Sequence, residues 1–218
     1  MKKIVIIALL ISGTVVKAQH DISLDALGFA FSKYGIGYEY AINANNSVGM
    51  NINFSSKNMF DDGVSNNDIY AAIDKEYKYT EMNLVPEYKA FLTPNKGNDG
   101  VYIGAYGKFR TSKSSGNTFT DTNLTTIPQY AQTDVSTTGF ALGALAGYKW
   151  KTSGALFLEA TVGVGKFIVN NVSYSNELAE NDDSFMEEDY IPYIGNTLAV
   201  DLRIALKIGI RIGGGSSK

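Results

Sequence analysis

The most regular hydrophobic pattern of the chain lies near its C-terminus, in residues 197–212. Alternate positions there are apolar, namely Leu198, Val200, Leu202, Ile204, Leu206, Ile208, Ile210 and Ile212. Small and charged residues occupy the positions between them. This period of two predicts a β-strand about three times as long as the five or six residues usual in soluble sheets. A large apolar environment must cover its first face, and lipid is the leading candidate.

The same period of two recurs along the chain and predicts eight strands, at 22–29, 34–42, 47–54, 79–92, 101–112, 136–150, 155–174 and 190–212. The connections after the second strand alternate between short and long: 43–46, 55–78, 93–100, 113–135, 151–154 and 175–189. An even number of antiparallel strands places both chain ends and the short turns on one side, as in bacterial outer-membrane barrels. We therefore predict an all-β fold, an eight-stranded antiparallel up-and-down transmembrane β-barrel with short periplasmic turns and longer extracellular loops.

Two details of this barrel are predicted from residue type. Pro86 cannot donate a backbone hydrogen bond, and a closed barrel has no free edge, so we expect a β-bulge there. The connection 113–135 is rich in Ser, Thr and Asn, which predicts a mobile surface loop.

Aromatic residues gather near both ends of the predicted strands. Toward the short turns lie Tyr38, Tyr40, Tyr148 and Trp150, and toward the long loops lie Phe29, Phe31, Tyr79 and Phe109. Two such belts are what the two interfaces of a bilayer select. One alternative remains open, because alternation does not tell which face points inward: a soluble periplasmic, lipocalin-like binding protein would have its apolar face inside.

The faces opposite the apolar ones hold nearly all the charges of the predicted strands. Six are acidic and seven basic: Asp25, Glu39, Glu81, Glu87, Glu159 and Asp201 against Lys89, Lys108, Arg110, Lys149, Arg203, Lys207 and Arg211. An eight-stranded barrel is only just wide enough for its own side chains, and buried charges persist only when they are paired. We therefore predict an ion-pair network that plugs the lumen. The balance of signs argues against an ion-selective pore, which uses rings of like charge.

The N-terminus predicts export. Lys2 and Lys3 precede an apolar run at 4–11, and 16–18 (Val-Lys-Ala) is suited to cleavage, so residues 1–18 are predicted to be a signal peptide. The apolar run is well short of the ~20 residues that a spanning helix needs. This leaves a barrel domain at 19–212 and a flexible tail at 213–218, and it indicates the outer membrane of a Gram-negative cell.

Composition excludes several kinds of chemistry. The net charge of −3 becomes −6 once the three lysines of the predicted signal are removed, which argues against nucleic acid as a partner. The chain has no cysteine, and its one histidine, His20, precedes the first strand and is a poor general base. We assign no catalytic residue, no cofactor and no enzymatic activity.

The connection 175–189 contains seven acids within thirteen residues: Glu177, Glu180, Asp182, Asp183, Glu187, Glu188 and Asp189. Clustered carboxylates are suited to Ca²⁺ or Mg²⁺, alone or together with lipopolysaccharide phosphates. The spacing does not match an EF-hand, and acidic runs are most often simply solvated. The segment is a candidate cation-binding loop.

Four segments carry a resemblance to a known family. They read ISLDALGF at 22–29, YGIGYEYAI at 34–42, NLVPEYK at 83–89 and VYIGAYG at 101–107. In these the chain resembles the small outer-membrane β-barrel proteins of unknown function, which are similar in architecture to the OmpA, OmpX and OmpW types. The resemblance implies an eight-stranded barrel and no catalytic residue. One departure is the last strand, which ends at Ile212, whereas many such barrels end in an aromatic residue that the assembly machinery recognises.

Three functional hypotheses follow. The favoured one is a monomeric, plugged outer-membrane barrel with a structural or surface-interaction role, whose partners are outer-membrane lipid, lipopolysaccharide and an extracellular ligand of the long loops. The second is a channel or binding barrel for a small solute or a hydrophobic compound, and the third is the soluble lipocalin-like protein.

Overall fold

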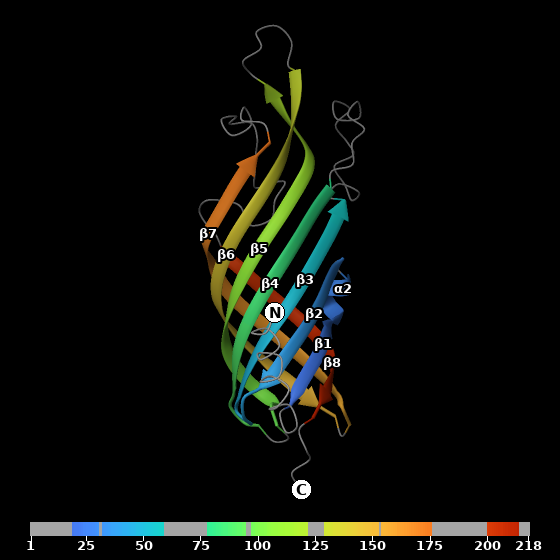
Figure 1. The fold of residues 1–218 in the computed structure, drawn as a ribbon, viewed down its shortest axis with the longest axis vertical. Coiled ribbons are helices and arrows are strands. Elements are labelled where there is room, and N and C mark those ends of the chain that lie inside the picture. The colour runs from blue at the N-terminus through green and yellow to red at the C-terminus, as the bar shows by residue number, and fades with distance from the viewer. Residues whose placement is uncertain are drawn as a thin grey trace, which may run out of the picture.

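The computed structural model describes residues 19–30, 32–58, 78–94, 97–121, 129–152, 154–175 and 200–213. The described elements are β1 (His20–Asp25), α2 (Ala26–Ala30), β2 (Lys33–Ala41), β3 (Asn46–Asn58), β4 (Lys78–Phe91), β5 (Gly100–Asp121), β6 (Gln129–Lys151), β7 (Leu156–Tyr174) and β8 (Val200–Ile212). Each strand pairs antiparallel with the next, and β8 pairs with β1, so the sheet closes into a barrel (Figure 1). The predicted eight-stranded up-and-down barrel is confirmed.

The two ends of the barrel differ. His20 pairs with Ile212, so the first and last strands meet at the end that also carries the turns after β2, β4 and β6. We call this the short-turn end and the opposite one the long-loop end. Helix α2 lies toward the long-loop end, where β1 stops (Figure 1).

The first strand is shorter than predicted. The period of two at 22–29 was expected to continue through Phe29, but the chain turns into α2 after Asp25. Asp25 Oδ1 accepts a hydrogen bond from Gly28 N at 3.1 Å, which stabilises the start of the helix as a capping residue does. The prediction for 26–29 is therefore wrong. At the other end of the chain, the predicted strand residues 190–199 and the aromatic Phe31 lie outside the described residues.

The segment 113–135 differs most from expectation. Instead of ending near residue 112, β5 continues to Asp121, and β6 begins at Gln129 (Figure 1). The prediction of a loop is therefore wrong for all of this segment except 122–128, which lie outside the described residues. Polar composition hides a strand, because the period of two reports the alternation of apolar and polar side chains and not hydrogen bonding.

The chain passes through Pro86 without a bulge. Leu84 pairs with Phe109 and Glu87 with Tyr106, so β4 and β5 keep one register across the proline. The missing donor interrupts the pairing locally but inserts no residue, and the predicted bulge is wrong. Register shifts occur instead between Ser114 and Asn117 of β5 and opposite Phe140 of β6.

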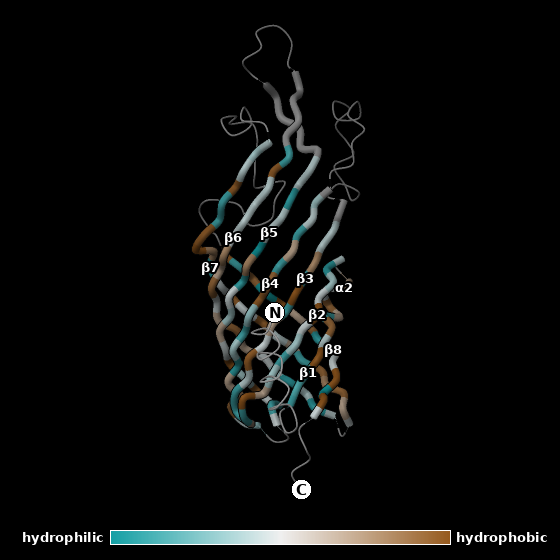
Figure 2. Tube along the Cα trace, in the orientation of Figure 1, coloured by the Kyte–Doolittle hydropathy of each residue, from teal (hydrophilic) through white to brown (hydrophobic). Residues whose placement is uncertain are grey.

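The apolar faces of the strands point outward. Ile204 is 71% exposed and Leu202 is 64% exposed, while the residues between and beside them point into the barrel. Hydropathy alternates along the strands (Figure 2), and the large apolar side chains of the alternate positions are the exposed ones. Lipid is the environment that covers an apolar belt of this extent, and the chain is a transmembrane barrel. The lipocalin-like alternative is wrong, because it requires the apolar face inside.

Most of the predicted interface aromatics that the structure describes point outward. Tyr38, Tyr148, Trp150, Phe29 and Phe109 are exposed, and Tyr40 is half-buried against His20. Tyr79 is the exception. It is 5% exposed, and its hydroxyl donates to Glu81 Oε2 at 2.7 Å inside the barrel. Its assignment to the interface is therefore wrong, since Tyr79 shares the inward face with Glu81. Within the described parts of the chain, no helix is both long and apolar enough to cross a membrane.

A charge placed on the apolar belt should destabilise the barrel according to its depth. Leu206→Arg, near the middle of the outward row of β8, should lower the free energy of unfolding by about 2–4 kcal/mol, and Ile212→Arg, at its end, by about 0–1 kcal/mol. Urea unfolding in lipid vesicles, followed by the fluorescence of the single tryptophan, Trp150, measures both. Equal losses at the two positions would contradict the placement of the belt.

Candidate functional site

The interior of the barrel contains most of the charged residues singled out in the sequence. At the short-turn end, Arg211 forms a bidentate pair with Asp21, with Nε donating to Oδ1 at 2.8 Å and Nη2 to Oδ2 at 2.9 Å. The same Arg211 Nη2 donates to the carbonyl oxygen of Asn98 at 2.8 Å. Lys149 Nζ donates to Asp21 Oδ2 at 2.9 Å. This cluster ties the first and last strands to β6 and to the turn after β4.

A second layer of ion pairs continues from Lys149. Its Nζ donates to Glu39 Oε1 at 2.7 Å, and Lys89 Nζ donates to Glu39 Oε2 at 2.6 Å and to Glu159 Oε1 at 2.5 Å. Tyr102 Oη also donates to Glu159 Oε1, at 2.6 Å. Lys89, Lys149 and Glu159 are each at most 2% exposed. The layer therefore consists of charges that are removed from bulk water and matched by partners of opposite sign.

Glu87 forms the third layer. Its Oε1 pairs with Arg203 Nη1 and accepts a hydrogen bond from Asn51 Nδ2 at 2.7 Å. Its Oε2 lies 3.6 Å from Lys89 Nζ and 3.7 Å from Lys207 Nζ. One carboxylate thus faces three cations, and local positive charge exceeds negative charge at this level.

Toward the long-loop end, Asp201 joins two residues of β5. Tyr106 Oη donates to Asp201 Oδ2 at 2.7 Å, and Lys108 Nζ donates to Oδ1 at 2.8 Å. Arg110 lies further along β5, where Nη2 donates to Asn170 Oδ1 at 2.9 Å and the guanidinium lies 4.3 Å from the centre of the Phe167 ring.

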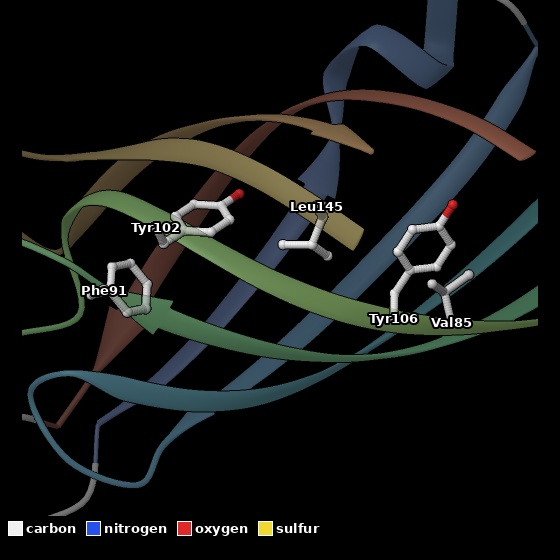
Figure 3. Packing of buried hydrophobic residues seen from close by; sticks show 5 residues of the cluster. All are labelled: Val85, Phe91, Tyr102, Tyr106 and Leu145. Carbon is white, nitrogen blue, oxygen red and sulfur yellow. The ribbon is translucent and has the colours of Figure 1, made fainter. Parts of the chain in front are cut away.

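Aromatic and aliphatic side chains fill the space between the ion pairs. Figure 3 shows them pointing into the barrel from β4, β5 and β6: Val85, Phe91, Tyr102, Tyr106 and Leu145. Gly143 and Gly147 on β6 lie against the Tyr106 and Tyr102 rings, where a Cβ atom would overlap them. Lys149 Nζ lies 4.8 Å from the centre of the Phe157 ring. Cation–π contacts of this kind add to the stabilisation of a buried ammonium.

The predicted network residues fall into two groups. Ten take part in the ion pairs above: Glu39, Glu87, Lys89, Lys108, Lys149, Glu159, Asp201, Arg203, Lys207 and Arg211. Asp25 instead binds the start of α2, Glu81 accepts from Tyr79 and from Asn83 Nδ2 at 2.6 Å, and Arg110 binds Asn170.

Sequence reasoning missed Asp21 and the aromatic part of the interior. Asp21 lies one residue before the predicted first strand, although it shares its parity with Ser23 and Asp25 and could have been found by extending the pattern backward. Tyr102 and Tyr106 share the parity of Lys108 and Arg110. The alternation therefore places both tyrosines on the inward face, but aromatic residues in a barrel sequence are more readily assigned to the membrane interfaces than to the lumen.

Two other candidates lie apart from this interior. The acidic residues of 175–189 are outside the described residues. His20 Nδ1 lies 2.7 Å from Tyr38 Oη, on the outside of the barrel near the short-turn end. Among the residues that the structure describes, no group of three or more His, Asp or Glu side chains could hold a metal ion.

Above Glu87 the interior is not completely filled. A cavity of about 110 Å³ lies among β1, β2, β3, β4, β5 and β8. Its charged lining consists of Asp25, Lys33, Glu81, Lys108, Arg203 and Lys207. Arg203 and Lys207 therefore belong both to the ion-pair network and to the wall of this cavity.

The solved structures that the chain is similar to are small outer-membrane proteins. CarO2 of Acinetobacter baumannii is 11% identical with a TM-score of 0.46, over 90% of this chain and 99% of that one. The major outer membrane protein of Thermus thermophilus is 15% identical with a TM-score of 0.41, over 89% and 99%. Neisserial surface protein A (NspA) is 16% identical with a TM-score of 0.38, over 89% and 94%. At these identities and scores, they add nothing to the argument for a function.

Comparison with curated protein sequences finds no match. A family model described as "Protein of unknown function (DUF3575)" matches residues 4–205, which is most of the chain. The chain, a closed eight-stranded membrane barrel with a charged and largely filled interior, therefore belongs to the DUF3575 family of proteins of unknown function.

Proposed function

We propose that this protein is a monomeric, non-enzymatic barrel of the Gram-negative outer membrane whose lumen is closed to solutes and whose function lies at the cell surface. The predicted signal peptide, which is outside the described residues, would export it, and outer-membrane lipid and lipopolysaccharide would surround its apolar belt. The short turns then face the periplasm and the long-loop end faces the exterior.

The observation that carries this proposal is the span of the ion pairs. Lys149 on β6 pairs with Glu39 on β2, and Arg203 on β8 pairs with Glu87 on β4. Each of these pairs joins strands four positions apart in a ring of eight, so it crosses the lumen from one wall to the opposite one. Side chains that meet in the middle of the barrel leave no continuous passage for a solute.

The same contacts disfavour catalysis in the described interior. The carboxylates of Asp21, Glu39 and Glu159 each accept hydrogen bonds from a lysine or an arginine. A general acid or base must be within hydrogen-bond reach of a substrate, whereas these carboxylates are bound by protein cations in the interior of the barrel. These groups are suited to holding the strands together.

The surface role rests on the hairpin formed by β5 and β6. The ladder between β4 and β5 ends at Lys78 and Ser115, and the ladder between β6 and β7 ends at Val135 and Tyr174. Beyond these points, 117–121 of β5 pair only with 129–133 of β6 among the described residues. Among the residues that the structure describes, neither outer edge of this two-stranded extension has a strand partner, and such edges can pair with an extracellular partner by the addition of a strand.

A second candidate function is a binding barrel for a small solute or a hydrophobic compound. The cavity above Glu87 is the observation that favours it, because it provides space lined by both polar and apolar groups without requiring a passage through the network.

The proposed closure of the lumen predicts that the protein does not conduct ions across a membrane. Purified protein inserted into planar bilayers should give no conductance steps above those of detergent alone. Protein boiled before insertion is the matched control for contaminating porins. Reproducible steps from the folded protein alone would contradict closure.

The ion-pair network should contribute strongly to stability. Lys149→Met leaves three buried carboxylates, those of Asp21, Glu39 and Glu159, without one of their partners and should lower the free energy of unfolding by about 3–5 kcal/mol. Lys113→Met is a matched control, because it removes an equally short pair, with Asp134 at 2.8 Å, whose lysine side chain is 54% exposed, and should cost about 0–1 kcal/mol. Urea unfolding of both variants in vesicles checks this. Similar losses would show that burial of the network adds nothing.

The proposed topology can be tested by thiol labelling, because the chain has no cysteine. A bulky, membrane-impermeant maleimide should label Lys113→Cys on intact cells and should label Ala44→Cys, in the exposed turn after β2, only after the outer membrane is opened. Labelling of Ala44→Cys on intact cells, or release of the protein without detergent, would contradict the proposal.

A further inference from the structure

The cavity in the upper part of the lumen contains a cation that the described residues do not satisfy. Lys207 is 4% exposed, and its nearest carboxylate oxygen among the described residues is Glu87 Oε2 at 3.7 Å, which is beyond hydrogen-bond distance. An ammonium group has three donors, and burying a charge without hydrogen bonds is costly. The Nζ of Lys207 therefore needs an acceptor, and the cavity it lines is where that acceptor can lie.

Glu87 meets this need only through its charge. Arg203 and the Asn51 amide engage its Oε1, while Oε2 lies 3.6 Å from Lys89 Nζ and 3.7 Å from Lys207 Nζ, too far to accept a hydrogen bond from either. Glu159, the cross-strand neighbour of Lys207, is bound to Lys89 and Tyr102. Neither carboxylate is available to Lys207 at hydrogen-bond distance in this arrangement.

The other acids at the cavity are also engaged by protein partners. Asp25 accepts a hydrogen bond from the backbone of α2, and Glu81 accepts hydrogen bonds from Tyr79 and Asn83. Asp201, which pairs with the cavity residue Lys108, accepts hydrogen bonds from Lys108 and Tyr106. Arg203 uses one terminal nitrogen for Glu87 and has further N–H groups, for which no acceptor is found among the described residues. Lys207 and Arg203 therefore lack acceptors within hydrogen-bond distance, although Asn83 Oδ1 also lines the cavity without a donor. A ligand that supplies acceptors to two cations is best matched when it is negatively charged.

We propose that this cavity is a binding site for a small anionic group, a carboxylate or a phosphate, held by Lys207 and Arg203. A volume of about 110 Å³ is several times what one water requires and is enough for a carboxylate or phosphate head with its hydration. The site is a pocket above the ion-pair network and does not depend on whether the lumen is closed below it.

Two sources of the anion fit this chemistry. The β1–β8 ladder ends at the pair Asp25 and Lys207, while β8 continues beyond it along β7 to Val200. Leu202 and Ile204 of β8, whose side chains face lipid, contribute to the cavity lining, and beyond the end of β1 the helix α2 lies against β8. An amphiphile could place its acidic head in the cavity from the lipid side, and a free anion could enter from the long-loop end.

Calorimetry of the full barrel in a non-ionic detergent, at low chloride, tests the site with acetate and inorganic phosphate. We expect a saturable heat with at least one of them, and at least a tenfold loss of affinity in Lys207→Met, because the charge-assisted hydrogen bonds are removed. Lys113→Met, the same substitution at an exposed position, should bind as the wild type does. No saturable heat in the wild type, or equal binding by Lys207→Met, would overturn the proposal.

A second variant keeps the test valid if Lys207→Met does not fold, as judged by heat-dependent gel mobility. Ala205 is 4% exposed and lines the cavity, so Ala205→Val reduces its volume while leaving every ion pair in place. Its binding should also weaken, and unchanged binding would overturn the proposal.

The source of the anion is identified by measuring the binding of decanoate, with decyltrimethylammonium as the amphiphile control. Binding much tighter than that of acetate indicates a lipid-side amphiphile, and equal binding indicates a free anion.

Discussion

The structure depends on the pairing of charges inside a barrel that is too narrow to hydrate them. Eight strands enclose space only for their own side chains, and every inward charge must find a partner there. Glu39 achieves this with Lys89 and Lys149, and Asp21 with Lys149 and Arg211. The pairs join strands that are far apart around the ring, so they act as cross-braces in addition to the backbone ladder.

This arrangement explains why the interior is both charged and aromatic. Charged side chains alone would leave gaps between them, and aromatic rings without polar groups could not form hydrogen bonds with the charges. Tyr102 serves both needs, because its ring packs against Phe91 while its hydroxyl donates to Glu159. Glycines on the neighbouring strand make room for the rings. The cavity of about 110 Å³ lies above Glu87, and only a small one of about 10 Å³ lies among the ion pairs below it.

The location of unfilled space gives the molecule two regions with different properties. The lower lumen is cross-braced by buried ion pairs, which is suited to a rigid anchor in the membrane. The upper lumen has polar walls and a cation, Lys207, that needs an acceptor, while the β5–β6 hairpin extends past its neighbours. Rigid support below and open hydrogen-bonding groups above are what a surface-binding function requires.

The sequence by itself determined the strand number, the division of each strand into an apolar and a charged face and most members of the ion-pair network, because a period of two separates the two faces of a strand. The exposure of the apolar side chains in the structure decided that this face points outward. Only the tertiary structure decided which charges pair, since partners such as Lys149 and Glu39 are brought together by closure of the ring and not by spacing along the chain. The structure also decided the helix after Asp25 and the extended hairpin, because local hydrogen bonds set both and neither leaves a hydrophobic pattern.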